Sequence, residues 1–317
     1  MDGIIDFFAE LSPRQWLFGV FGLFMLLFLV VDLGLFRPKP QKITFKAALF
    51  QTLFWILSSM GFAYLTHEFY DEAIAVQFTV AYFTEKVLSI DNIFVFVLVF
   101  NYFKINPKYY HQILFWGILG AFVFRAIFIT LGAALIQHFH FVLYLFAVFL
   151  LFTGVKMFFQ KEEDTFNPGE NAFFRFLNKR LNFTPDDANG KFWVRKNGVL
   201  YFSNLFLALI FIEVSDIIFA FDSIPAVFAI SQDPFVVYTS NMFAIMGLRA
   251  MFFLLSSVVE RFAYLQQGIS FVLVFIGVKM LLEIFDIKIP EVYALLFILA
   301  TLTISILYSW VKTKVKE

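Results

Sequence analysis

Long apolar runs follow one another along the whole chain, and polar residues gather in the gaps between them. A membrane-spanning helix needs about 20 mostly apolar residues. Nine runs meet this requirement, at residues 16–36, 45–66, 73–103, 112–136, 140–159, 199–224, 237–258, 264–282 and 291–311. The pattern therefore predicts an all-α integral membrane protein with nine transmembrane helices.

The composition agrees with this class of protein. Of the 317 residues, 61% are hydrophobic and 15% are charged, whereas soluble domains have about 25% charged residues. The chain has no cysteine, which excludes disulfides, thiolate catalysis and thiolate metal sites. The one sizeable polar segment, 160–198, is too short for a separate enzyme domain. We therefore expect neither an enzyme nor a nucleic-acid-binding protein.

The basic residues of the loops predict the orientation in the membrane. Inside loops carry the excess of lysine and arginine in membrane proteins. With the N-terminus placed outside, nearly all loop lysines and arginines lie inside, and the outside receives only Arg14 and Lys288. The first fifteen residues are acidic rather than basic, so they do not resemble a cleaved signal peptide. The predicted topology is N-out and C-in.

An acidic pair, an arginine and a lysine occur twice in the same order, which indicates an internal repeat. The matching segments are "EKVLSIDNIFVF" (85–96) and "DIIFAFDSIPAV" (216–227), "FVFRAIF" (122–128) and "MGLRAMF" (246–252), and "FTGVKMFF" (152–159) and "FIGVKMLL" (275–282). Each unit contains three predicted helices, an odd number, so the second unit must cross the membrane in the opposite sense. Inverted repeats are typical of transporters whose sites lie near the middle of the membrane.

The repeat divides the chain into five parts. Residues 1–72 hold two spans, 73–159 form the first repeat, 160–198 form a linker on the inner side, 199–282 form the inverted repeat, and 283–317 hold the last span and a basic tail. Within the linker, "NAFFRFLNKRL" places its apolar residues on one helical face. This pattern suits a helix lying on the membrane surface, and an ordinary linker explains it equally well.

Ionisable residues inside the predicted spans carry the functional signal. Six are acids, namely Asp32, Glu85, Asp91, Glu213, Asp216 and Asp222. A charge in mid-membrane costs at least ~2.5–3.5 kcal/mol, so each acid needs a partner. Lys86, Arg125 and Arg249 are the expected internal partners.

Three other charged positions lie near span ends. Lys156 and Lys279 are expected to reach the membrane surface with their long side chains. Asp32 is expected either to pair with a base such as Arg125 or to reach the surface near Arg37. The remaining acids outnumber the remaining bases, and a bound divalent cation would offset most of that excess.

The side chains near the acids offer oxygen ligands. The candidate ligands are Glu85, Asp91, Asn92, Glu213, Asp216, Asp222 and Ser223. Carboxylate, amide and hydroxyl oxygens suit hard cations such as Mg²⁺, Ca²⁺ and Mn²⁺. The four histidines fall at span ends or in loops, away from these acids, so a histidine zinc site is not supported.

A regular helix cannot aim all of these ligands at one ion. Asp91 lies about 120° from Glu85 around a helix, and Asp222 lies about 120° from Asp216. Either the helices unwind locally, or the acids serve two adjacent sites. Because Pro225 removes a backbone donor and restricts its neighbour, we expect the sixth helix to break near residues 222–225.

"EKVLSIDNIFVF", "EVSDIIFAFDSIPAVFAI" (213–230) and "SNMFAIMGLRAMFFLL" (240–255) closely resemble segments of the TerC family of bacterial membrane proteins, and its Alx-type members in particular. The resemblance covers about residues 15–310. It implies a bacterial inner-membrane protein that exports manganese, and it points to the same seven candidate ligands. The residues alone imply only a hard cation.

The expected function is a secondary transporter that exports Mn²⁺, with no organic cofactor. Protons are the expected counter-ion, because empty carboxylates held close together tend to bind protons. One alternative is an exporter of another hard cation such as Ca²⁺. A second is a membrane platform that recruits stress-response or tellurite-resistance partners through residues 160–198. Tellurite itself fits poorly as a substrate, because an oxyanion would meet a net acidic site. The sequence identifies no protein partner.

Overall fold

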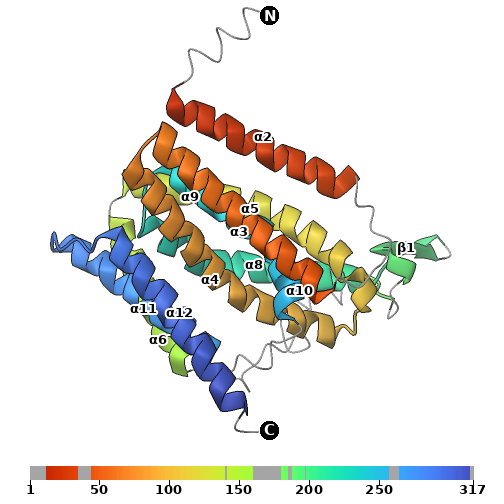
Figure 1. Cartoon of the computed structure of the whole chain (residues 1–317). Helices are drawn as coiled ribbons and strands as arrows, with labels where there is room; N and C mark the ends of the chain where they lie inside the picture. The colour runs from red at the N-terminus through yellow and green to blue at the C-terminus, as the bar shows by residue number, and fades with distance from the viewer. Residues whose placement is uncertain are drawn as a thin grey trace, which may run out of the picture.

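The computed structural model describes residues 12–34, 44–139, 141–159, 180–184, 188–196, 198–256 and 264–314. Nearly all of these residues are helical (Figure 1). The helices are α2 (Pro13–Gly34), α3 (Phe45–Phe69), α4 (Glu72–Tyr102), α5 (Tyr110–His138), α6 (Phe141–Phe159), α8 (Asn204–Phe228), α9 (Pro234–Met246), α10 (Leu248–Leu255), α11 (Leu265–Ile284) and α12 (Glu291–Lys314). Short 3₁₀ helices cover Pro107–Tyr109 and Ala188–Gly190. Each predicted span corresponds to one helix, or to the pair α9 and α10.

Several of these helices can cross a membrane. In the part of the chain that the structure describes, α3, α5, α6, α8, α11 and α12 are long and apolar enough, and α9 with α10 forms a seventh candidate if the bent pair is one span. The apolar part of α2 described here, Pro13–Phe28, is shorter. α4 is long, but it carries Glu85, Lys86 and Asp91 close together. The protein is an all-helical, multi-pass membrane protein.

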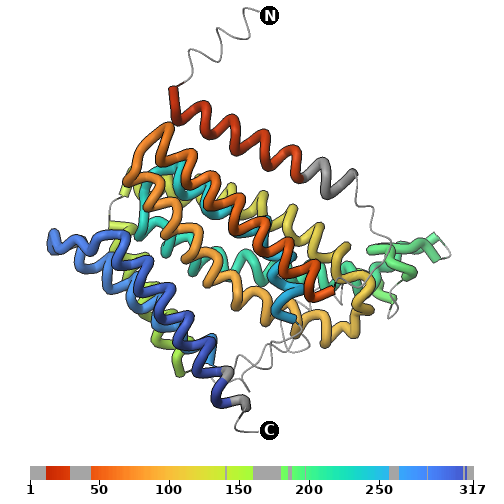
Figure 2. Tube along the Cα trace, in the orientation of Figure 1, coloured from red at the N-terminus to blue at the C-terminus, as the bar shows by residue number. Residues whose placement is uncertain are grey.

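α4 and α8 form the centre of the bundle. They pack on each other, and α4 also packs on α3, α9 and α12, while α8 packs on α5 and α6. α2 lies along one edge, and α6, α11 and α12 lie together at the opposite edge (Figure 2). The two helices that carry the candidate ligands are therefore surrounded by other helices.

The predicted break in the sixth helix is wrong. α8 is one continuous helix from Asn204 to Phe228, with Pro225 inside it. Pro225 lies in the last turn, so it removes only the donor to the carbonyl of Phe221. The backbone ladder resumes directly, because Ala229 donates to the carbonyl of Pro225 at 3.0 Å. One missing hydrogen bond near a helix end does not force a break.

A break occurs instead between α9 and α10, at Gly247. The two helices meet at an angle of 40°. The ammonium of Lys86 on α4 lies against Gly247, and it donates to the carbonyl of Ala244 at 3.3 Å. A side chain at position 247 would meet the Lys86 ammonium and would lie 3.3 Å from Trp55 Cβ, so a larger residue there would displace the lysine from this position.

α6 and α11 approach each other closely through two glycines. A Cβ on Gly154 would lie 2.8 Å from Val274 Cγ2, and a Cβ on Gly277 would lie 2.9 Å from Leu151 Cγ. Small residues at such crossings let helix backbones approach closely in membranes. Ser270 adds a hydrogen bond to the carbonyl of Gly154 at 2.6 Å. The two glycines therefore fix the spacing of this helix pair.

The segment before α8 contains a small β-hairpin that the sequence pattern did not predict. β1 (Trp193–Lys196) pairs antiparallel with β2 (Val199–Phe202). The hairpin lies at one end of the bundle (Figure 1), and Gln112 of α5 donates to the carbonyl of Gly190 at 3.0 Å. Most of the proposed surface helix "NAFFRFLNKRL" (171–181), namely residues 171–179, lies outside the described residues.

Replacing Gly154 by alanine tests the close packing of α6 and α11. We expect Gly154→Ala to destabilise the protein by about 1–3 kcal/mol, because the added methyl group overpacks the crossing. Gly61→Ala on α3 is the matched control, because nothing lies within 4 Å of a Cβ at that position. Thermal unfolding in detergent measures both. Equal melting temperatures for the two variants would contradict the packing described here.

Candidate functional site

Arg125 of α5 lies at the centre of the bundle with only 1% of its surface exposed. Its Nη1 donates to Glu85 Oε2 of α4 at 2.6 Å. Its Nη2 and Nε face Asp216 of α8, with Nη2 3.4 Å from Oδ1 and Nε 3.5 Å from Oδ2. One guanidinium thus joins two carboxylates that are 1–3% exposed and come from two different helices.

Two amide side chains complete this cluster. Asn241 of α9 accepts from Arg125 Nη1 at 2.8 Å and donates to Glu85 Oε1 at 2.9 Å. Asn92 of α4 donates to Asp216 Oδ1 at 3.1 Å. We call Arg125, Glu85, Asp216, Asn92 and Asn241 the Arg125 network. The network links four helices, and with both acids ionised it carries one net negative charge.

Asn241 was missed by the sequence analysis. It lies within "SNMFAIMGLRAMFFLL", where it is the one amide in an apolar helix. A buried amide needs hydrogen-bond partners, so its position within a span was the available signal. It is fully buried, and both of its polar groups are used in the Arg125 network.

A small cavity lies beside the Arg125 network. It holds about 10 Å³, room for roughly one water molecule, and its lining residues are Leu88, Asp91, Asn92, Arg125, Met157, Phe219, Asp222, Ser223 and Leu273. We call it the carboxylate cavity. Asp91 and Asp222 are close enough for their charges to repel each other. Asn92 lines the cavity and also belongs to the Arg125 network.

Ser223 gives the carboxylate cavity an unused polar atom. Its Oγ is buried and has no hydrogen-bond partner among the described residues, and Ser223 is only 2% exposed. Buried polar atoms in membrane proteins are normally satisfied, so this hydroxyl is available to a bound ion or water. Asp222 also faces Thr153 and Lys156 of α6, and Lys156 is exposed.

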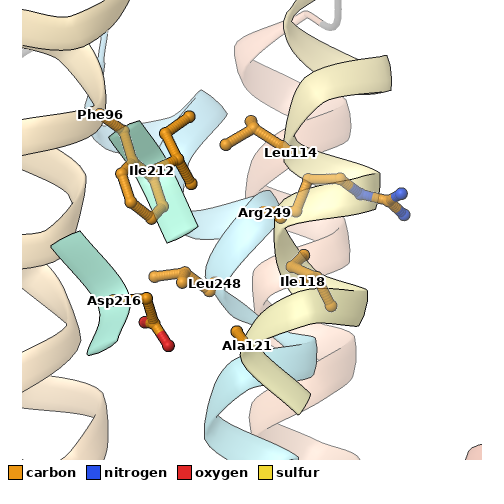
Figure 3. Close-up of a pocket in the computed structure, with 9 residues that line it drawn as sticks. Phe96, Leu114, Ile118, Ala121, Ile212, Asp216, Leu248 and Arg249 are labelled. Carbon is orange, nitrogen blue, oxygen red and sulfur yellow. The ribbon is translucent and has the colours of Figure 1, made fainter. Parts of the chain in front are cut away.

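A second small cavity reaches Asp216 from another side (Figure 3). Its walls are mostly apolar, and it is lined by Phe96, Leu114, Gly117, Ile118, Ala121, Ile212, Asp216, Leu248 and Arg249. The half-buried Arg249 projects away from Asp216 in Figure 3. Of the two repeat-related arginines, Arg125 therefore forms the centre of the network, whereas Arg249 lies at the edge of this cavity.

Glu213 precedes Asp216 by three residues on α8, and their charges are close enough to repel each other. Its carboxylate packs directly against Gly120 of α5, where a Cβ would collide with it. Its Oε2 is buried without a hydrogen-bond partner. Lys86 lies elsewhere, because its ammonium binds at the break between α9 and α10. The side chain of Asp32 lies outside the described part of the chain, so its predicted pairing stays a prediction.

Lys279 is buried against two acidic partners that the sequence analysis did not predict. It is 1% exposed, and its Nζ lies 2.9 Å from Glu283 Oε1 and 3.0 Å from Glu291 Oε1. It also donates to the carbonyl of Ala229 at 3.2 Å. Two carboxylates and the carbonyl just after α8 surround the ammonium, and a helix C-terminus favours positive charge. The reach of Lys279 to the membrane surface stays a prediction.

The candidate ligands therefore form two groups, and one further acid lies beside Asp216. Glu85 and Asp216 contact Arg125, Asp91 and Asp222 line the carboxylate cavity, and Glu213 lies against α5. Within the described residues, no three histidine, aspartate or glutamate side chains come together in a way that could hold one metal ion. Of the two arrangements that helix geometry allowed, the structure has two adjacent groups on regular helices.

The fold and this polar centre define a multi-pass helical membrane protein with a charged, buried core. The match to known families agrees with that class. Residues 70–317 match the model of the integral membrane protein TerC family, and the chain belongs to this family.

Relatives of similar length support the family assignment. An uncharacterised membrane protein of Myxococcus xanthus, STKORF319, is 42% identical over 303 residues, covering 96% of this chain and 94% of that protein. Alx of Escherichia coli K12 and Alx of Salmonella typhi, each named as a proposed membrane-bound redox modulator, are 42% identical over 310 residues, covering 95% of both chains. No solved structure matches the chain.

Removing the positive charge of the Arg125 network should be costly. We expect Arg125→Met to destabilise the protein by about 3–5 kcal/mol, because it leaves Glu85 and Asp216 buried without a counter-charge. Adding Glu85→Gln and Asp216→Asn should restore part of the loss. Thermal unfolding in detergent measures each variant.

Arg14→Met is the matched control for this experiment. Arg14 pairs with Asp233 at the same 2.6 Å distance, but its side chain is 39% exposed. An exposed ion pair contributes only about 0–1 kcal/mol. If both arginine variants lost the same stability, the buried network would not have the energetic role described here.

Proposed function

We propose that this protein is a secondary transporter that exports divalent manganese through the carboxylate cavity. The observation that carries the proposal is the lining of that cavity. It brings together two carboxylates, an amide and an unpartnered buried hydroxyl around a space of ionic size. Such oxygen ligands suit a hard divalent cation, and buried ionisable groups in a membrane protein mark ion pathways.

The repeat supports this choice of site. When "EKVLSIDNIFVF" is aligned with "DIIFAFDSIPAV", Asp91 corresponds to Asp222 and Asn92 to Ser223. Leu88 corresponds to Phe219 in the same way, so three equivalent pairs line one cavity. A site shared equally by two inverted repeats lies near their common axis, where transporters of this architecture bind their substrates.

Helix packing supports the same inverted arrangement. Exchanging the two repeats turns the contact of α4 with α9 into the contact of α8 with α5, and both contacts exist. It also turns the contact of Gly154 with Val274 into the contact of Gly277 with Leu151, and both occur. We therefore propose nine spans, with the N-terminus outside and the C-terminus inside a bacterial inner membrane.

Arg125 has a defined role in the proposed cycle. Its guanidinium neutralises much of the charge of Glu85 and Asp216, so these acids are stable in the absence of an ion. Asn92 contacts Asp216 and also lines the carboxylate cavity. A cation in the cavity that engages Asn92 would change its hydrogen bond to Asp216. Ion binding can thereby alter the contacts among α4, α5 and α8.

The choice of manganese rests on the family resemblance, whereas the ligands favour hard cations in general. Calcium is the nearest alternative substrate. The name given to Alx suggests a redox role for that relative, but the present chain has no cysteine to provide thiol–disulfide chemistry. Transport of a redox-active metal ion would connect a redox role with metal export.

A partner-recruiting platform is the alternative of a different class. The β-hairpin exposes Trp193, Val199 and Leu200 beside Arg195 and Lys196, which is a surface that a partner could contact. Alanine substitutions of Trp193 and Arg195 separate the two functions. They should leave metal transport intact if the protein is a transporter, and abolish the cellular function if it is a platform.

Transport by purified protein in lipid vesicles tests the proposed site. We expect Asp91→Asn and Asp222→Asn each to weaken Mn²⁺ binding by at least about tenfold, equivalent to about 1.4 kcal/mol, because each removes a charged ligand. Glu68→Gln is the control, since Glu68 is an exposed acid near the end of α3. A fluorescent pH indicator inside the vesicles records proton counter-transport in the same assay.

Two results would contradict the proposal. Wild-type protein that neither binds nor transports Mn²⁺ would exclude manganese as the substrate. Normal transport by both aspartate variants would exclude the carboxylate cavity as the site. Competition by Ca²⁺ in the same vesicles identifies calcium if it is the better substrate.

A further inference from the structure

Met157 of α6 is the one sulfur-containing side chain among the described residues that line the carboxylate cavity. The other donor atoms of the lining are oxygens and nitrogens, and Leu88, Phe219 and Leu273 carry no donor at all. The common role of methionine is to fill irregular space in an apolar core. Because Met157 lies beside two carboxylates, its thioether sulfur could also serve as a soft metal ligand among hard oxygen ligands.

The helix geometry places Met157 next to Asp222. Thr153 faces Asp222, and Met157 follows Thr153 by four residues, which puts the two side chains on the same face of α6. The close approach at Gly154 holds this part of α6 against α11. Gln266 of α11 also donates to the carbonyl of Met157 at 3.5 Å. The backbone that carries Met157 is therefore well fixed beside the cavity.

A thioether changes which divalent cations such a site prefers. Mg²⁺ and Ca²⁺ are bound almost entirely through oxygen, so a sulfur position adds little to their binding. Transition metals accept softer ligands more readily, and the preference grows with the softness of the ion. A site with two carboxylates and one thioether would bind Mn²⁺ in preference to Mg²⁺ and Ca²⁺, and it would bind Cd²⁺, a soft ion, tightly.

We infer that Met157 determines the specificity of the carboxylate cavity for transition-metal cations over Mg²⁺ and Ca²⁺. This inference rests on the proposed transport function, and it adds a residue that the oxygen ligands did not indicate. It also explains how a cavity whose acidic groups are those of a Ca²⁺ or Mg²⁺ site could serve manganese in a cytoplasm rich in Mg²⁺.

The repeat supplies a matched control. Met157 corresponds to Met280 in the alignment of "FTGVKMFF" with "FIGVKMLL". Met280 is 5% exposed and packs in the main apolar core of α11, and the described lining of the cavity does not include it. Leucine has a similar volume to methionine and lacks the sulfur. Met157→Leu and Met280→Leu therefore make the same chemical change, at the cavity and away from it.

The experiment measures competition with Mn²⁺ uptake by Cd²⁺, Mg²⁺ and Ca²⁺ in vesicles containing the full chain. We expect Met157→Leu to weaken competition by Cd²⁺ by about tenfold, while Mg²⁺ and Ca²⁺ compete as well as before or better. Met280→Leu should behave like the wild type. An unchanged order and strength of all three competitors in Met157→Leu would overturn the inference.

A spectroscopic measurement keeps the inference testable if Met157→Leu does not fold. X-ray absorption at the cadmium edge of Cd²⁺-loaded wild-type protein should detect a sulfur neighbour. Because the chain has no cysteine, any such sulfur belongs to a methionine. A shell of oxygen and nitrogen alone would overturn the role of Met157. Failure of the proposed function is distinguishable, since the wild type would then neither bind nor transport Mn²⁺.

Discussion

The ion pairs of Arg125 with Glu85 and Asp216 are the constraint on which the rest of the structure depends. Charges taken out of water are stable only when they are paired and fully hydrogen-bonded. The guanidinium meets this condition by drawing α4 and α8 towards α5, and Asn241 extends the cluster to α9. The packing of the bundle centre is thus organised around one positive charge.

The same constraint separates the acids into two environments. Since Arg125 pairs with both Glu85 and Asp216, one positive charge within the protein offsets part of the charge of these two carboxylates. Asp91 and Asp222 lie on the adjacent faces of α4 and α8, and they line the carboxylate cavity instead. A single helix pair thereby presents one pair of acids that shares the charge of Arg125 and one pair with room for a cation.

Hydrophobic pattern was sufficient to predict the helices, but not their irregularities. Each apolar run became a helix or a bent pair, because the membrane requires backbone groups to be satisfied within the segment. The break was predicted at Pro225 and found at Gly247. A proline near a helix end costs one hydrogen bond. At Gly247 the side chain of Lys86, from a distant helix, lies against the backbone. Local sequence does not reveal this tertiary contact.

The charged residues of the site could be predicted from the sequence, whereas its neutral residues Asn241 and Met157 were not predicted. The cost of burying a charge singles out Glu85, Asp216 and Arg125 from sequence alone. Asn241 is marked only as the one amide of an apolar helix, and Met157 is not distinguished from the apolar residues around it. Lys279 looked free to reach the surface, because its partner Glu291 comes from the start of the next helix and becomes a neighbour only in the folded chain.

The contacts at the two ends of α8 have a mechanical consequence. At one end Ser203, the residue before the helix, bonds the carbonyl of Lys191 at the base of the hairpin, and at the other end Lys279 binds the carbonyl of Ala229. A helix that is hydrogen-bonded at both ends cannot slide along its own axis unless one of these bonds breaks. Any displacement of Asp216 and Asp222 along the axis of α8 therefore has to break the bond at Lys191 or the bond at Ala229.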